Sequence, residues 1–283
     1  FSAHPDACPL VGALVTPDAI TLTQTRHPLL RRPQCPACGR PHPVAFPPAL
    51  GPAPRGDAER SVPPEQFVAT YQRHVDPVLG AIASLRRVGA PDEPRHAYVA
   101  GSNYATPRGD LAALRRGLRS DSAGKGRTDA EARASAIAEA LERLSGVYQG
   151  DEPTRRARLA ELDDAVDPAA LLHFSPAQYA ARAQWNADPR RFERVPEPFD
   201  PDAAILWSPA WSLTRGRPRS LPTAFCWYDA PRGDGPAFCV ADSNGCAAGA
   251  TLVEAIVQGA LELCERDAVA IWWYNRLRRP GVD

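Results

Sequence analysis

Apolar and acidic residues alternate at helical spacing in two separate stretches of the chain. The first stretch covers residues 134–144 and predicts an amphipathic helix. Its polar arc spans about 100° of the helix surface and consists of Ser135, Glu139, Glu142 and Arg143. Its apolar arc, which we expect to face the core, consists of Ala134, Ile137, Leu141 and Leu144.

The second stretch covers residues 253–266 and repeats this pattern. Its polar arc consists of Glu254, Gln258, Glu262, Glu265 and Arg266. Its apolar arc consists of Val253, Ile256, Val257, Ala260 and Cys264. Both stretches read (Ser/Gln)xxxExxER, so each predicted helix carries two carboxylates three residues apart on its polar face.

Four carboxylates would crowd one cleft if the two polar faces met. Like charges at close range in a poorly solvated site cannot all stay ionised without a counter-charge. A metal ion is the natural partner, and a ligand set made only of oxygen atoms selects a hard cation such as Mg²⁺. Because Mg²⁺ commonly binds carboxylates together with substrate phosphates, the pattern indicates a nucleotide site.

Each of the two helices follows a segment of small residues with one polar residue in it. Before the first helix we expect a loop over residues 120–127, which contains Lys125, the only lysine of the chain. Before the second helix a turn at Asn244 and Gly245 leads into the small residues 246–249. Such segments at helix N-termini suit anionic oxygens, although the GxxxxGK[ST] phosphate-binding motif is absent.

Helix capping adds a second similarity between the two stretches. Thr128 with Glu131 and Thr251 with Glu254 are both capping boxes, and the first helix is expected to end near Gly146.

Each polar feature also has an interpretation that needs no ligand. The pairs Glu139–Arg143 and Glu262–Arg266 are i, i+4 pairs, which stabilise any solvated helix by a few tenths of a kcal/mol. Either helix alone would suit an ordinary protein surface, and Glu254 has its capping role. The recurrence of a small-residue segment followed by ExxER favours a ligand site.

The remaining apolar runs predict mainly short strands separated by turns. The expected strands are residues 10–15, 19–22, 96–101, 203–207, 208–213, 224–228 and 237–241. A helix is expected from Pro64 to Tyr71, residues 78–85 suit a buried strand or helix turn, and residues 151–200 suit an insertion or edge region. The predicted fold class is α/β (α+β), with an antiparallel sheet.

The segment Cys35-Pro-Ala-Cys38 is half of a zinc knuckle, in which two thiolates converge on one tetrahedral ion. Cys8, His27 or His42 could complete the site, as could a second CxxC before Phe1, and an exposed turn without metal is the alternative. Proline-rich residues 46–66 predict a linker. We therefore expect three parts: a zinc-bearing part over 1–45, the linker over 46–66, and a larger domain over 67–283.

The composition excludes several functional classes. The 33 basic and 33 acidic residues balance, which gives no electrostatic reason to expect nucleic acid or membrane surfaces as partners. No apolar run is long enough to span a membrane. The seven scattered cysteines favour a reducing cytoplasm, and the absence of methionine predicts that the chain is part of a longer protein.

These motifs together resemble the YcaO superfamily over residues 70–283. The matching positions are Gly124-Lys125-Gly126, Ser135, Glu139, Glu142, Arg143, Ser243-Asn244-Gly245, Ala248, Gly249, Glu254, Gln258, Glu262, Glu265 and Arg266. Residues 27–39 are similar to the zinc-bearing end of the leader-peptide-binding, ubiquitin-activating-enzyme-like domain that is fused to YcaO in azoline-forming cyclodehydratases. The family's proline-rich carboxy terminus would lie beyond Asp283, and the other zinc cysteines are expected before Phe1.

The resemblance implies a YcaO-type ATP-binding domain that uses ATP, Mg²⁺ and a structural Zn²⁺. By resemblance, the Mg²⁺ ligands are Glu139, Glu142, Glu262 and Glu265, and the zinc ligands include Cys35 and Cys38. The nucleotide-binding residues implied in addition are Lys125, Ser135, Arg143, Asn244, Glu254, Gln258 and Arg266. No side chain is assigned as a catalytic acid or base.

The implied activity is the cyclodehydration of Cys, Ser or Thr residues in a ribosomal precursor peptide to thiazoline or oxazoline, as in bacteriocin maturation. Two alternatives are peptide thioamide or amidine formation at the same nucleotide site, and a non-catalytic scaffold that binds leader peptides. The partners implied are the precursor peptide with its leader and core, a ubiquitin-activating-enzyme-like protein, a flavin dehydrogenase and a second copy of the chain.

Overall fold

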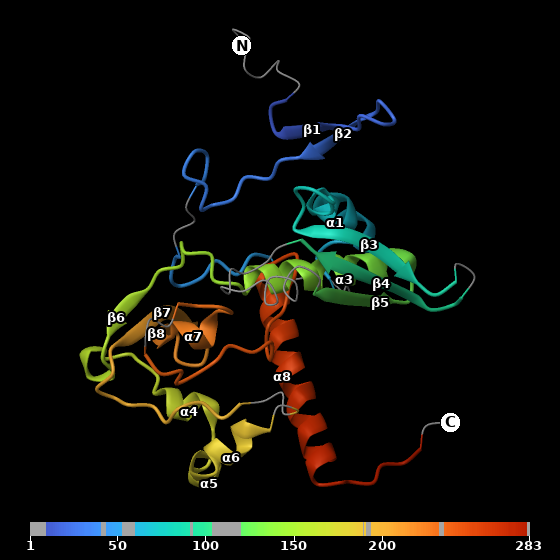
Figure 1. Cartoon of the computed structure of the whole chain (residues 1–283). Helices are drawn as coiled ribbons and strands as arrows, with labels where there is room; N and C mark the ends of the chain where they lie inside the picture. Colours follow the sequence, from blue (N-terminus) through green and yellow to red (C-terminus); the bar gives the residue numbers. More distant parts are fainter. Residues whose placement is uncertain are drawn as a thin grey trace. The chain divides into compact units, whose positions relative to one another are not determined.

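The computed structural model describes residues 10–40, 44–52, 60–90, 93–103, 120–188, 190, 194–231 and 235–281 (Figure 1). The chain combines helices with antiparallel sheets, as the sequence predicts, and divides into two compact units. The first unit comprises Phe1–Gly39, Leu50–Ser145 and Asn244–Asp283, and the second comprises Arg40–Ala49 and Gly146–Ser243.

A three-stranded antiparallel sheet and one long helix form the centre of the first unit. The strands are β3 (Ile82–Val88), β4 (His96–Ser102) and β5 (Asp121–Gly126), in the order β3-β4-β5. Helix α3 (Asp129–Ser145) packs on this sheet, and α1 (Pro64–Tyr71) packs against α3. The core consists of Ile82, Ala100, Ala136, Ile137 and Ala140.

Several predicted elements of this unit are confirmed. Helix α1 covers the predicted residues, and β4 lies where a strand was expected. Helix α3 ends at Ser145, next to the predicted stop at Gly146. The expected loop around Lys125 is wrong, because residues 121–126 form strand β5, which pairs with β4. The buried strand or helix turn expected at 78–85 is a strand that begins later, β3 at Ile82.

The N-terminal hairpin consists of β1 (Ala13–Pro17) and β2 (Gln24–Pro28). The strand expected at 19–22 is wrong, because these residues form the turn of the hairpin. The Asp18 carboxylate accepts the N–H groups of Ile20 (2.8 Å) and Thr21 (3.1 Å), a local interaction that competes with extended pairing. Leu22 has a positive φ of 56° in the same turn.

Helix α8 (Leu252–Tyr274) forms where the second helical stretch was predicted. The expectation that its apolar arc faces the core is wrong, since only Glu254 and Gly259 are buried. Val257 is 47% exposed and Leu261 is 56% exposed. Helical periodicity therefore identified the helix without identifying its buried face. None of the described helices, α8 included, is both long and apolar enough to cross a membrane.

The second unit contains another three-stranded antiparallel sheet. Its strands are β6 (Arg155–Ala157), β7 (Ile205–Ser212) and β8 (Arg217–Pro222), in the order β6-β7-β8. Short helices η3 (Leu159–Glu161), α4 (Pro168–Leu172), α5 (Pro176–Ala180) and α6 (Arg182–Ala187) lie in the predicted insertion. Trp207 is buried and donates its indole N–H to the Ala157 carbonyl at 2.9 Å, which ties β6 to β7.

Three strand predictions in this unit differ from the structure. Residues 203–207 and 208–213 belong to one strand, β7. Residues 224–228 do not form a strand, because α7 (Thr223–Cys226) occupies their first part after the conformationally fixed Pro222. Residues 237–241 have no ladder partner among the described residues.

Candidate functional site

Capping and core packing fix the orientation of α3. The Thr128 hydroxyl accepts the Glu131 N–H at 3.2 Å, and the Glu131 carboxylate accepts the Arg127 N–H at 2.7 Å. The stripe that faces the core consists of Ala132, Ala136, Ile137 and Ala140. Glu139 and Glu142 project outside this stripe and are only partly buried. The predicted polar face of the helix is therefore available for binding.

Glu139 is held from two directions. Its Oε2 accepts the backbone N–H of Ala123 at 3.1 Å. Its Oε1 accepts two hydrogen bonds from the Arg143 guanidinium, from Nε at 3.1 Å and from Nη2 at 2.7 Å. The carboxylate is consequently fixed between β5 and the next turn of its own helix.

Glu262 on α8 has the same arrangement. Its Oε2 accepts the backbone N–H of Gly245 at 3.1 Å, and its Oε1 accepts Arg266 Nη2 at 3.0 Å. In both copies the first glutamate of ExxER thus binds the preceding small-residue segment with one oxygen and the motif arginine with the other. The sequence repeat corresponds to a repeated geometry.

Glycines allow the two small-residue segments to approach their helices. A Cβ atom at Gly124 would lie 2.1 Å from the Ala136 nitrogen, and one at Gly259 would lie 2.5 Å from the Gly245 carbonyl oxygen. Gly245 itself has a φ of 80°, a left-handed conformation that favours glycine. This close packing places the Ala123 and Gly245 N–H groups beside the two glutamates.

Glu142 connects the two copies. Burial, followed by the negative charges of Glu139 and Glu262, raises its pKa to about 7, against the effects of Arg143 and of a hydrogen bond from the Ala248 N–H. The ionised form of a carboxyl group is disfavoured, and its pKa rises, when other carboxylates lie close and little water is present. Carboxylates from α3 and α8 therefore share one electrostatic environment, as the sequence pattern predicts.

This pKa predicts how stability depends on pH without metal. A pKa of about 7, above the ordinary 4.5, means that protonated Glu142 favours the folded state. That contribution is complete below about pH 4.5 and is lost as the pH rises through 7. Urea unfolding without Mg²⁺ should therefore show Glu142→Gln gaining stability over the parent between about pH 5 and pH 8. A difference that does not change with pH would contradict the assignment.

Two of the other predicted nucleotide ligands, Arg143 and Arg266, bind Glu139 and Glu262 directly. All of the others except Glu254 also lie at half-buried or exposed positions: Lys125 on β5, Ser135 on α3, Asn244 in the turn, and Gln258 and Glu265 on α8. No interaction in the structure joins Lys125 or Glu265 to Glu142, so their roles stay predictions.

Glu254 differs from the other predicted ligands because it is buried and its carboxylate binds backbone groups. One oxygen accepts the Ala250 N–H at 2.9 Å, and the other accepts the Ser61 N–H. Burial alone would raise its pKa, but the hydrogen bonds from Ser61 and Ala250 outweigh burial and lower it. Its structural role is to fix the start of α8, and a contact with nucleotide stays a prediction.

Backbone donors are the part of this site that sequence reasoning missed. The N–H groups of Ala123, Gly245 and Ala248 each contact a motif carboxylate. Their only signal in the sequence is the run of small residues before each helix.

The described residues contain no group of three or more His, Cys, Asp or Glu side chains arranged to hold a metal ion. The donor types nevertheless suit Mg²⁺, because burial and the charges of Glu139 and Glu262 disfavour ionised Glu142, and a divalent cation would offset this effect.

At the zinc half site, the Sγ atoms of Cys35 and Cys38 lie 3.5 Å apart. Hydrogen bonds from the Cys38 and Ala37 N–H groups lower the pKa of Cys35, whereas the hydrogen bond to Cys35 raises the pKa of Cys38, so the metal-free pair favours one thiolate. His27 is excluded as a further ligand, because both ring nitrogens already contact Thr16 and Asp76. Cys8 and His42 lie outside the described residues.

Solved structures similar to this chain include two heterocyclases. One, a heterocyclase in complex with substrate and cofactor, is 43% identical with a TM-score of 0.85, and the match covers 96% of this chain and 37% of that one. The heterocyclase TruD is 36% identical with a TM-score of 0.66, over 96% of this chain and 33% of that one. The YcaO protein of Methanopyrus kandleri bound with AMPPCP and Mg²⁺ shares the fold at 21% identity and a TM-score of 0.52, over 81% of this chain and 50% of that one.

An uncharacterized protein of Methanothermobacter thermautotrophicus is 30% identical over 163 residues, which are 57% of this chain and 36% of that protein. The chain thus spans between about a third and a half of the length of these relatives. A family model described as YcaO cyclodehydratase, ATP- and Mg²⁺-binding, matches residues 123–283. This match begins at the residue whose N–H holds Glu139 and includes both copies of ExxER, and on this ground the chain belongs to the YcaO family.

Proposed function

We propose that the whole protein uses ATP to convert Cys, Ser or Thr residues of a ribosomal precursor peptide to thiazolines or oxazolines. The observation that carries the proposal is the repeated geometry of Glu139 and Glu262 around Glu142. A cluster of carboxylates with a raised pKa gains most from a divalent cation, and Mg²⁺ bound this way commonly brings a nucleotide phosphate.

The residues divide between metal and phosphate binding. In the proposal Mg²⁺ is held by Glu139, Glu142, Glu262 and Glu265 and neutralises phosphate charge. The phosphates and ribose are contacted by Lys125, Ser135, Arg143, Asn244, Gln258 and Arg266. Glu254 fixes the start of α8 through its hydrogen bonds to backbone N–H groups. Arg143 and Arg266 already orient Glu139 and Glu262, so their first task is to position ligands.

The chemistry is activation of a leaving group. The Cys, Ser or Thr side chain gives up its thiol or hydroxyl proton to solvent and attacks the carbonyl carbon of the preceding amide, which moves the C=O π electrons onto the oxygen. This oxygen then takes the γ-phosphoryl group of ATP, and ADP is released. The C–O bond then breaks, phosphate leaves with the electron pair, and the nitrogen loses its proton to form the C=N bond. Phosphate is a far better leaving group than hydroxide, so the protein mainly needs to position reactants and stabilise phosphate charge.

The two heterocyclases among the relatives favour ring formation over thioamide or amidine formation at the same site. The test is to incubate the full-length protein with ATP, Mg²⁺ and a candidate precursor peptide, and to follow ADP release and peptide mass. The expected result is one water lost per ring, with ADP formed in step. Exchange of oxygen for sulfur would instead support thioamide formation, and peptide binding without ADP release would support a scaffold.

We also propose that Cys35 and Cys38 supply two ligands of a structural zinc ion. Full-length protein should contain stoichiometric zinc that is lost from Cys35→Ser and Cys38→Ser, because each substitution removes a thiolate ligand. Cys264→Ser, which changes an exposed cysteine on α8, is the matched control. Equal zinc content in all four proteins, measured by mass spectrometry of the metal, would refute this assignment.

The remaining parts of the proposal follow from the same activity. The cytoplasm is the compartment that we expect for this activity. We also propose that the chain consists of three parts, over 1–45, 46–66 and 67–283. The proposed protein partners and the homodimer would help to bring the precursor peptide to the nucleotide site.

A further inference from the structure

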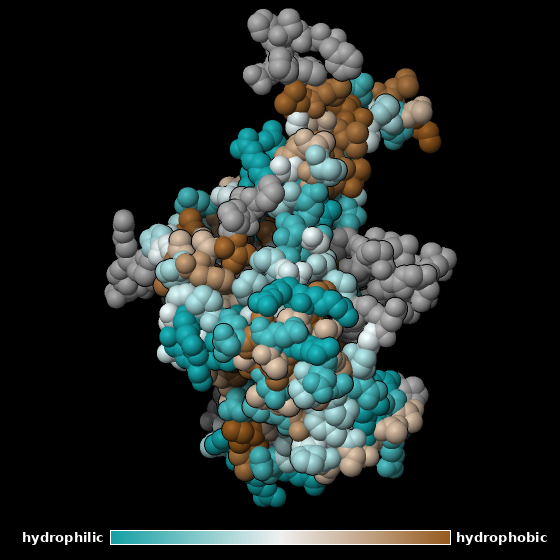
Figure 2. Space-filling model, turned by 90° about the vertical axis from the view of Figure 1, so that its left-hand side faces the viewer, coloured by the Kyte–Doolittle hydropathy of each residue, from teal (hydrophilic) through white to brown (hydrophobic). Residues whose placement is uncertain are grey.

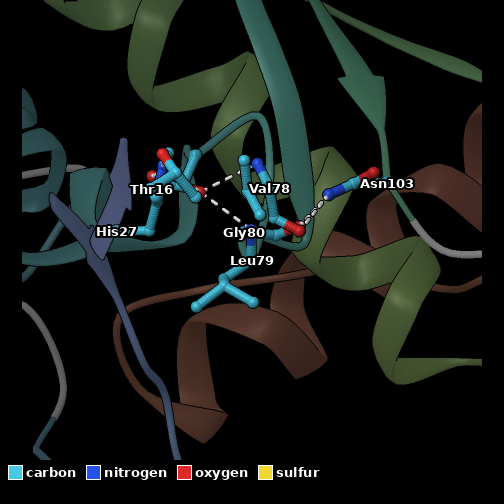
Figure 3. Close-up of polar contacts among 7 residues, drawn as sticks. Thr16, His27, Val78, Leu79, Gly80 and Asn103 are labelled. Carbon is cyan, nitrogen blue, oxygen red and sulfur yellow. Dashed lines mark hydrogen bonds and ion pairs between the residues drawn. The ribbon is translucent and has the colours of Figure 1, made fainter. Parts of the chain in front are cut away.

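A buried chain of hydrogen bonds lies outside the candidate site and joins the N-terminal hairpin to the loop before β3 (Figure 3). The Thr16 hydroxyl lies 2.8 Å from His27 Nε2, and His27 Nδ1 lies 2.9 Å from Asp76 Oδ2. His27 is 3% exposed, and Asp76 is 7% exposed. Thr16 and His27 belong to the same hairpin, whereas Asp76 is 49 residues from His27, so the contact between His27 and Asp76 depends on tertiary structure.

Asp76 is also bound by its own loop. Its Oδ1 accepts the backbone N–H groups of Val78 at 2.9 Å and Leu79 at 2.8 Å. Burial alone would raise its pKa, but hydrogen bonds from Leu79, His27 and Val78 outweigh burial and lower it. Because the ionised carboxylate only accepts, His27 Nδ1 donates to it, and His27 Nε2 makes the contact with the Thr16 hydroxyl.

The loop continues this network toward the sheet. Asn103, next to the end of β4, donates its side-chain N–H groups to the carbonyls of Gly80 (3.1 Å) and Val78 (3.4 Å). The Asp76 N–H binds the Ile82 carbonyl at 2.9 Å. The loop that contains Asp76 is therefore held at the start of β3 by Ile82 and at the end of β4 by Asn103.

Few side chains of the hairpin strands are buried. His27 is the only buried residue in β1 and β2. Its large apolar side chains face solvent: Leu14 is 41% exposed, Ile20 is 93% exposed and Leu22 is 86% exposed, and apolar surface gathers at the top of Figure 2. Burial of apolar area therefore adds little to docking of the described hairpin.

A Thr–His–Asp chain also resembles a nucleophile with its base and orienting acid. The Val78 and Leu79 N–H groups, which could otherwise face an oxyanion, already bind Asp76. The arrangement therefore suits a structural connection better than catalysis.

We propose that Thr16, His27 and Asp76 form a latch that docks the hairpin, and with it the Cys35–Cys38 segment that follows, onto the sheet that carries β5. Removal of His27 would leave Asp76 Oδ2 buried without the donor that it has in the structure, while Oδ1 kept the Val78 and Leu79 N–H groups. Loss of a buried hydrogen-bond donor is more costly than loss of an exposed contact. The hairpin would then open locally while the sheet stayed folded.

Hydrogen exchange on the full-length protein tests this latch without any assay of activity. His27→Leu should raise exchange in peptides covering residues 10–29 by about tenfold or more, with β4 and β5 unchanged. Thr16→Val should have a smaller effect in the same peptides. Thr25→Val is the matched control, because Thr25 lies opposite Thr16 in the hairpin register and is exposed.

Two results would overturn the latch. If the hairpin of His27→Leu exchanges its amide hydrogens at the same rate as the hairpin of the parent protein, other contacts dock it. Equal loss of protection in the hairpin, β4 and β5 would mean that His27 supports the whole unit.

Discussion

Glu142→Gln and Glu262→Gln are each expected to lower ATP hydrolysis by the full-length protein at least about a hundredfold. A neutral amide cannot replace a carboxylate in balancing the charge of Mg²⁺. The measurement is the rate of ADP formation at saturating peptide, together with affinity for a non-hydrolysable ATP analogue in the presence of Mg²⁺.

The control for this prediction is Glu131→Gln. It removes an equal charge from the first turn of the same helix, where Glu131 interacts with Arg127 and not with the carboxylate cluster. Its hydrolysis rate should stay near that of the parent. If Glu142→Gln turns over ATP as fast as Glu131→Gln does, α3 does not carry the nucleotide site.

Gly124→Val should have the largest effect on stability. The Cβ of valine would lie 2.1 Å from the Ala136 nitrogen and 2.3 Å from the Ala132 carbonyl oxygen. Both atoms belong to the backbone of α3 and cannot rotate away, so strand and helix must separate. We expect the free energy of unfolding to fall by about 3 kcal/mol or more.

Urea unfolding of Gly124→Val and Gly281→Val measures this difference. A Cβ at Gly281 meets no atom within 4 Å, so the second variant should unfold like the parent. The same clash should also displace the Ala123 N–H from Glu139, so Gly124→Val should lose nucleotide affinity as well. Parental stability in Gly124→Val would show that β5 and α3 pack less closely than described.

Periodicity was sufficient to predict the helices that carry the site. The capping threonine of α3 was readable from its residues, whereas of the apolar arc expected to face the core only Ile137 is buried, and the rest of the buried stripe is Ala132, Ala136 and Ala140. Periodicity did not indicate that the apolar arc of α8 faces solvent. An amphipathic pattern identifies the apolar side of a helix. Whether that side is buried depends on which other segments pack against it.

The local errors have a common physical origin. Gly124-Lys125-Gly126 looks like a loop because glycine is poor in strands, yet here glycine is needed for contact between β5 and α3. The stretch 224–228 is rich in aromatic residues, which favours a strand, but Pro222 and Thr223 start a helical turn instead. In both cases tertiary contacts or a neighbouring proline outweighed intrinsic propensity.

The sequence was sufficient to predict which side chains form the candidate site, but not which groups they contact. Repetition of ExxER identified Glu139 and Glu262, but the matching N–H contacts from Ala123 and Gly245 required the fold. Likewise His27 suited zinc by residue type, whereas the structure assigns both of its ring nitrogens to Thr16 and Asp76.

The central claim is that carboxylates of α3 and α8 together bind the divalent cation of a nucleotide. Its most direct test is a crystal structure of the full-length protein with Mn²⁺ and a non-hydrolysable ATP analogue, in which anomalous scattering locates the metal. We predict Mn²⁺ about 2.1 to 2.2 Å from carboxylate oxygens of both helices and from phosphate oxygens. A nucleotide whose metal contacts neither helix, or only one, would contradict the account.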